Sequence, residues 1–130
     1  MKVNTEDITG VALDWAVAQA LDLRVTISPI VQYWQTPREK IIGYQIINDP
    51  PERDEFGIVG FNPSTDWSQG GPIMDEHKVA VDHVLNYCLA TMDYWENASK
   101  GETMLIAAMR CIVKHKLGDT VTIPKELKNG

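Results

Sequence analysis

The residues best suited to chemistry gather in one short segment, FNPSTDWSQGGPI, at residues 61–73. Its side chains offer hydroxyl, carboxylate, indole and carboxamide groups, carried by Ser64, Thr65, Asp66, Trp67 and Gln69. Hydroxyls and carboxylates hydrogen bond to sugars and amines, and an indole ring provides a flat face on which a base can stack. The composition of this segment therefore predicts a ligand-binding loop.

The same segment contains a glycine pair, Gly70 and Gly71, whose backbone amides can approach an anion closely because no Cβ intervenes. Prolines and glycines break regular helices and central strands, so we expect an irregular loop here rather than a regular helix. The structural alternative is a single helical turn that Asn62 caps, Pro63 begins and Gly70 ends. That alternative gives no account of Trp67 in a polar neighbourhood.

A second candidate group is Arg110, at the edge of the apolar stripe of a predicted C-terminal helix. Its guanidinium could reach out to water, or it could clamp a phosphate or carboxylate with two hydrogen bonds. Residues 1–99 carry 15 acids and 6 bases, whereas residues 100–130 carry 3 acids and 6 bases. We therefore predict that Arg110 points toward the Gly70–Gly71 turn with an anion between them. The competing prediction is that Arg110 pairs with Asp66 and holds the loop shut.

The remaining titratable residues form no recognised catalytic or metal-binding pattern. The three histidines show no HExxH spacing and share no metal-like spacing with Cys88 or Cys111. The chain also lacks GxSxG, a P-loop and GxGxxG. We therefore expect no metal, no cofactor and no catalytic residue, and we favour binding over catalysis.

Length and composition predict one globular domain, residues 1–130, with 44% hydrophobic and 23% charged residues. The formal net charge of −6 argues against binding nucleic acid through its phosphates. No apolar run approaches the roughly 18 residues of a transmembrane helix. Two cysteines without metal-like spacing are typical of a reduced, intracellular protein. We expect a protein of the cytoplasm that binds neither nucleic acid nor membrane.

Near the N-terminus, a helix is predicted over residues 5–22, with Asn4 or Thr5 as its cap. It is apolar on two faces, which predicts burial on two sides. In a chain of this size, such a helix is either central to the fold or shared with a second subunit. We expect a homo-oligomer in which this helix contributes to the contact.

Strands are predicted between residues 25 and 61, where β-branched and aromatic residues concentrate in VTISPIVQYW, IIGYQII and GIVGF. The segments HKVAVDHVL and CLATMDYW favour a further strand pair, although each could instead be helical.

Residues 103–117 show the clearest helical periodicity, that of an amphipathic helix packed on one side and ended by Gly118. A short strand, TVTI, follows and ends at Pro124. The predicted fold class is α+β, a small and mostly antiparallel sheet with one helix near each terminus.

Three ordered blocks, GVALDWAVAQAL, NPSTDWSQGGPI and LIAAMRCIVKHKLGDTVTIPKEL, resemble the NinX family of tailed-phage proteins. The resemblance implies a small, non-structural accessory protein that acts inside the bacterium. Positions that recur in the family correspond here to Leu13, Asp14, Trp15, Ser64, Thr65, Asp66, Trp67, Gly70, Gly71, Pro72, Ala107, Ala108 and Arg110. On this basis Asp14 and Trp15 join the candidate ligand-binding residues.

Phage accessory proteins of this size include non-catalytic oligomers that sequester nucleotide-derived immune signals, such as cyclic ADP-ribose derivatives or cyclic dinucleotides. By this analogy we expect the protein to bind such a molecule without altering it and thereby to counteract bacterial anti-phage defence. The alternative is an interaction protein that inhibits a host factor through the acidic surface of residues 49–55 or 75–82. A nucleotide-processing enzyme is a third alternative.

Overall fold

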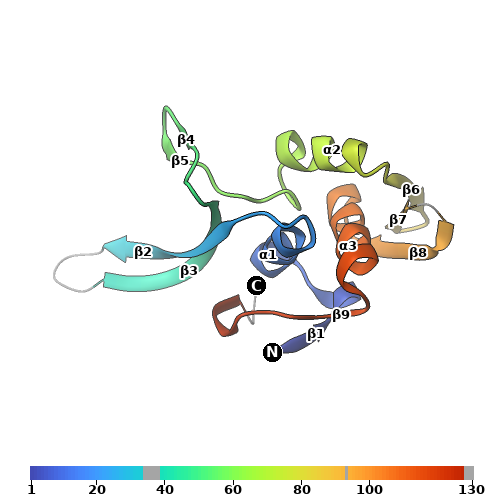
Figure 1. The fold of residues 1–130 in the computed structure, drawn as a ribbon, viewed down its shortest axis with the longest axis horizontal. Coiled ribbons are helices and arrows are strands. Elements are labelled where there is room, and N and C mark those ends of the chain that lie inside the picture. Colours follow the sequence, from blue (N-terminus) through green and yellow to red (C-terminus); the bar gives the residue numbers. More distant parts are fainter. Residues whose placement is uncertain (34–38, 93, 128–130) are drawn as a thin grey trace.

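The computed structural model describes residues 1–33, 39–92 and 94–127, with helices and short antiparallel strands in mixed order (Figure 1). The strands are β1 (Lys2–Asn4), β2 (Val25–Tyr33), β3 (Glu39–Asn48), β4 (Arg53–Asp54), β5 (Gly57–Ile58), β6 (Ala80–Val84), β7 (Tyr87–Met92), β8 (Tyr94–Gly101) and β9 (Thr120–Thr122). The helices are α1 (Gly10–Ala20), α2 (Trp67–Glu76) and α3 (Met104–Leu117), with 3-10 turns η1 (Thr5–Asp7) and η2 (Lys125–Leu127). The predicted α+β class is confirmed, but the strands form separate small sheets, and α2 adds a helix mid-chain.

Helix α3 lies at the centre of the molecule, between α1 on one side and strands β7 and β8 on another (Figure 1). The hydroxyl of Thr103 accepts from the N–H of Ile106 at 3.1 Å, and Gly118, with φ of +97°, ends the helix as predicted. All of its residues from Ala107 to Val113 are buried. The predicted one-sided packing is therefore wrong, because α3 is covered on several sides.

Helix α1 is shorter than predicted. Asn4 does accept a hydrogen bond from the N–H of Glu6, but it caps the 3-10 turn η1 rather than a long helix. Extended Ile8 and Thr9 then separate η1 from α1, whose first residue, Gly10, has a φ of +58°. Most of α1 is buried within this single chain, against α3 and β3. The predicted burial is confirmed, and it needs no second subunit.

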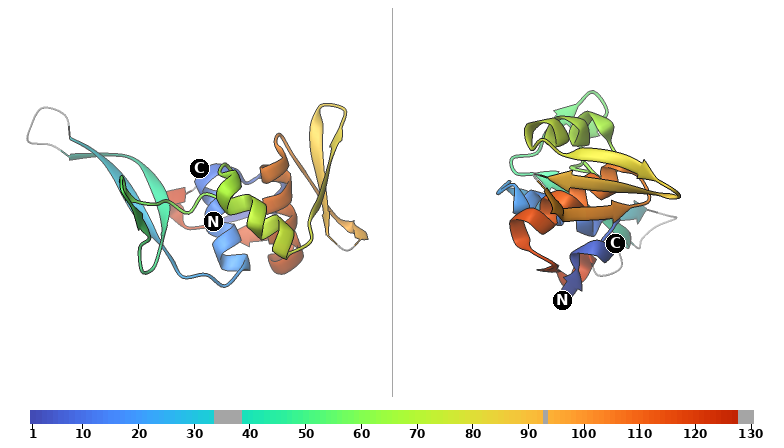
Figure 2. Two further views of the ribbon diagram at one scale, coloured as in Figure 1. Left: turned by 90° about the horizontal axis from the view of Figure 1, so that it is seen from above. Right: turned by 90° about the vertical axis from the view of Figure 1, so that its right-hand side faces the viewer.

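Strands β2 and β3 form a long hairpin that extends away from the helices (Figures 1 and 2). Its base packs on the core through the buried side chain of Ile46. Farther out, Ile30, Ile41 and Ile42 are exposed.

Strands β6, β7 and β8 form a three-stranded sheet, so the strand prediction for this region is confirmed and the helical alternative is wrong. Cys88, Ala90 and Met92 alternate along β7 as its buried residues. This sheet packs on α3. At the other end, the predicted strand β9 pairs with β1 and brings together the two terminal segments of the chain. Within the described ranges, no helix is long and apolar enough to span a membrane.

Candidate functional site

Two candidate residues 50 positions apart in the sequence meet inside the protein. The N–H of Ser64 donates to the Asp14 carboxylate on α1 at 2.9 Å, and both residues are buried. Burial raises the pKa of Asp14 from 3.8 to about 6, against the opposing effect of the backbone hydrogen bond from Ser64. In the part of the chain that the structure describes, the buried Ser64 Oγ has no hydrogen-bond partner. The pair fastens the segment before α2 to α1.

The predicted irregular loop is wrong for residues 67–73, which belong to helix α2. The alternative of a helical turn ended by Gly70 is also wrong, because Gly70, Gly71 and Pro72 lie inside this helix. Asp66 caps this helix, since its Oδ1 accepts from the N–H and hydroxyl of Ser68 at 2.9 and 2.7 Å. These hydrogen bonds hold the pKa of Asp66 below its usual value. The cap offsets part of the local cost of the glycines and of Pro72.

Gln69 connects the start of α2 to the preceding segment. Its side-chain amide donates to the carbonyl of Gly60 at 2.8 Å and to Asn62 Oδ1 at 2.9 Å, and its Oε1 accepts from the N–H of Asn62. It also donates to the second carboxylate oxygen of Asp66 at 3.3 Å. The polar groups of Asp66 and Gln69 are therefore used within the protein.

Neither glycine forms the predicted anion-binding turn. The N–H of Gly70 donates to the carbonyl of Asp66 at 2.8 Å. A Cβ at Gly70 would lie 2.4 Å from the carbonyl oxygen of Pro63 and 2.6 Å from Leu105 Cδ2. Gly70 thus lets α2 approach α3 closely, which is a packing role. A Cβ at Gly71 would meet only the Trp67 ring, at 3.9 Å.

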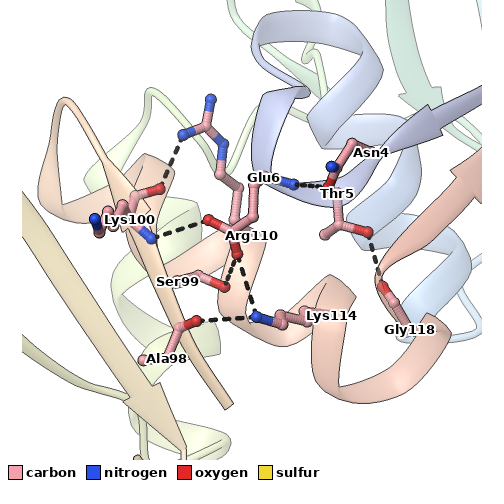
Figure 3. A network of polar contacts seen from close by, with 9 residues as sticks. All are labelled: Asn4, Thr5, Glu6, Ala98, Ser99, Lys100, Arg110, Lys114 and Gly118. Atoms are coloured by element: carbon pink, nitrogen blue, oxygen red, sulfur yellow. Dashed lines mark hydrogen bonds and ion pairs between the residues drawn. The ribbon is translucent and has the colours of Figure 1, made fainter. Parts of the chain in front are cut away.

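Arg110 is buried in α3, and Figure 3 shows it in a network that joins α3 to β8 and η1. Its Nε donates to the carbonyl of Ile8 at 2.9 Å, and its Nη1 donates to the carbonyl of Lys100 at 2.8 Å. It bonds to these carbonyls rather than to Asp66. The predicted anion clamp and the predicted Arg110–Asp66 pair are both wrong, because the guanidinium satisfies buried backbone groups instead.

Glu6, which was not predicted as a site residue, is central to the same network (Figure 3). Its carboxylate accepts from Ser99 Oγ at 2.9 Å and from the N–H of Lys100 at 3.3 Å, and it lies 3.6 Å from Lys114 Nζ. An acid in a first helical turn also suits the helix dipole, so the sequence held no signal for this second use.

The remaining candidates are Trp67, Thr65 and Trp15. The side chain of Trp67 is 54% exposed at the first position of α2, and Thr65 is exposed beside it. Trp15 is half-buried and packs against the core. Of the ten candidates, only Trp67 and Thr65 combine open surface with a chemistry that suits an external ligand.

Two highly exposed apolar residues, Phe56 and Leu85, were not predicted as site residues. Phe56 is 90% exposed between β4 and β5, and Leu85 is 97% exposed between β6 and β7. Their signal in the sequence is weak, because a single apolar residue in a turn is common on protein surfaces. Over the described residues, no cluster of three or more histidine, cysteine or acidic side chains could hold a metal ion.

Comparison with known proteins assigns the chain to a family. The family model described as "Bacteriophage P22, NinX" matches residues 4–116, which include α1, α2, all but the last residue of α3, and the segment around Asp14 and Ser64. No curated protein matches the chain significantly. Since the model covers far more than half of the 130 residues, the chain belongs to the phage NinX family.

Proposed function

We propose that this phage protein acts inside the host bacterium by binding a host protein, without catalysis, through the tip of its β4–β5 hairpin. The observation that carries the proposal is Phe56, whose side chain is 90% exposed in an acidic turn. Glu52, Asp54 and Glu55 are exposed around it. Exposed aromatic side chains commonly anchor protein interfaces, and surrounding charges select the partner. The expected partner offers an apolar pocket with basic groups at its rim.

The hairpin also holds its tip in a defined shape. Asp54 Oδ1 accepts from the N–H of Phe56 at 2.8 Å, and Arg53 and Asp54 pair with Ile58 and Gly57. Gly57 has φ of +126°, which a side chain would strain. A tip that is ordered before binding loses less conformational entropy on binding.

The test compares Phe56→Ala with Leu85→Ala, because both residues are almost fully exposed hairpin-tip residues. Each variant and the parent protein would be immobilised and exposed to host extract, and the retained proteins would be quantified by mass spectrometry. We expect one or more proteins to be retained by the parent and by Leu85→Ala, to be lost with Phe56→Ala, and to elute at raised salt. An identical set of retained proteins for all three would refute the proposal.

A second candidate function is sequestration of a nucleotide-derived signal in support of phage infection. What favours it is the open ring of Trp67, since exposed aromatic rings stack on bases. The N–H of Gly70 and the guanidinium of Arg110 already bond to backbone carbonyls. This candidate function therefore lacks the phosphate contacts that the sequence suggested.

Incubating the protein with a panel of nucleotide signals and then denaturing it by heat separates the two candidates. Depletion followed by intact release, lost in Trp67→Ala, would support sequestration. Altered products would indicate an enzyme. No depletion would leave the protein-binding proposal alone.

A further inference from the structure

The β6–β7 hairpin holds a thiol next to an imidazole. Cys88 Sγ lies 3.4 Å from His83 Nδ1, and the two residues are direct cross-strand partners. Residues directly opposite each other in an antiparallel pair project from the same face of the sheet. A tight turn at Leu85, with φ of +55°, follows the next pair, Val84 and Tyr87, and therefore fixes this register.

The two partners differ in their exposure. Cys88 is 3% exposed on the central strand of the sheet, whereas His83 is exposed on the edge strand β6. The imidazole can therefore exchange protons with water while it contacts the buried thiol. A thiol nucleophile requires a base within hydrogen-bond reach, and His83 meets this requirement.

A cavity of about 410 Å³ gives this pair a place to meet a small molecule. Both residues line it, together with Tyr87 on β7, Glu102, and Thr103 and Met104 at the start of α3. Its volume falls within the roughly 300–1,000 Å³ of small-molecule sites. Cys88 thus borders this space, although only 3% of the residue is exposed.

We propose that Cys88 is a nucleophile toward small disulfides and that His83 is its proton acceptor. The Cys88 thiol gives its proton to His83 Nδ1, and the thiolate attacks one sulfur of the disulfide. The S–S bond breaks, and the departing thiolate takes the proton back from His83. Cys88 is thereby oxidised to a mixed disulfide, and the other half of the reagent leaves reduced as a thiol.

Cys111 provides an internal reference in the same molecule, because it is 0% exposed in α3. Its modification reports opening of the fold as a whole. His77 provides a matched histidine, since it lies at the end of α2 and lines a different cavity.

The experiment exposes the reduced full chain to glutathione disulfide and follows adducts at both cysteines by mass spectrometry. We expect an adduct at Cys88 well before any at Cys111. His83→Gln should slow the Cys88 reaction by about 10-fold or more, because base assistance typically contributes 10²–10⁴ in rate. His77→Gln should leave the Cys88 rate unchanged.

Added imidazole distinguishes a proton acceptor from a structural side chain. In His83→Ala, with folding checked by thermal melting, free imidazole should restore a large part of the lost rate. Equal rates at Cys88 and Cys111 would overturn the proposal. An unchanged rate in His83→Gln, or a folded His83→Ala that imidazole does not rescue, would also overturn it.

Discussion

The interior and the hairpin tips of this protein use their residues in opposite ways. Inside, the side chains of Arg110 and Asp14 hydrogen bond to backbone groups of Ile8, Lys100 and Ser64 and so join segments that are far apart in the sequence. At the tips, the apolar side chains of Phe56 and Leu85 pack against little or nothing of their own chain. Most of the polar residues that first suggested ligand chemistry therefore bond within the fold, whereas two apolar side chains that the sequence did not single out lie open at the surface.

The largest effect on stability is expected for Arg110→Ala. The variant would leave the carbonyls of Ile8 and Lys100 without their donors, and an unsatisfied buried polar group costs about 1–3 kcal/mol. We expect a loss of about 3 kcal/mol or more in the free energy of unfolding, measured by urea denaturation. Arg110→Lys should lose less, because its ammonium can still reach one carbonyl. Unchanged stability in Arg110→Ala would reopen the case for a ligand-binding arginine.

Asp14 should make the stability depend on pH. Its pKa is about 6 in the folded protein and near 3.8 in the unfolded chain, so the folded state holds more protons between these values. The free energy of unfolding therefore falls as pH rises from about 4 to about 6, by roughly 3 kcal/mol in total.

Asp14→Asn should remove this dependence, since a neutral amide can still accept from the N–H of Ser64. Urea titrations at several pH values would check it. A variant that loses stability across this range as steeply as the parent protein would show that the dependence arises elsewhere.

Gly70 and Gly71 form a matched pair within α2. Gly70→Ala places a Cβ against the carbonyl of Pro63 and against Leu105, and overpacking of this kind costs about 1–3 kcal/mol. Gly71→Ala places its Cβ 3.9 Å from the nearest neighbour, the Trp67 ring. It should be neutral or stabilising by up to about 1 kcal/mol, because alanine favours helix more than glycine does. Equal melting temperatures for the two variants would contradict the proposed packing role of Gly70.

The smallest effects on stability are expected at the surface. Phe56→Ala should change the free energy of unfolding by no more than about 0.5 kcal/mol, and Trp67→Ala by no more than about 1 kcal/mol. Their effects should appear in binding instead. A large drop in melting temperature for Trp67→Ala would mean that its ring is part of the core, where truncation costs roughly 3–5 kcal/mol.

Elements whose own residues determine them were predictable from the sequence. Helix α3 has a clear apolar period, a capping threonine and a terminal glycine, and these signals act within a few residues of one another. The strand pairs β2–β3 and β6–β7 likewise follow from β-branched runs separated by turns.

Helix α2 was not predictable, because its stability depends on contacts that local rules do not contain. By local rules, Gly70 predicts the end of a helix. Its place inside α2 is explained only by its neighbours, because a Cβ there would clash with Pro63 and Leu105. The same limit applies to the candidate site. Asp14 and Ser64 are both positions that recur in the family, and they contact each other in the structure. The position of the Arg110 guanidinium depends instead on the carbonyls of Ile8 and Lys100, which are distant or unmarked in the sequence. Spacing along the chain carries no information about those carbonyls.

The pairing of β1 with β9 also bears on how the protein is made. Strand β1 pairs with β9, in the register Lys2–Thr122, Val3–Val121 and Asn4–Thr120. The hydroxyl of Thr5 donates to the carbonyl of Gly118. During synthesis, the first strand must therefore wait with its backbone groups in water until residue 122 has left the ribosome. The pairing of β1 with β9 can therefore form only after translation of that segment.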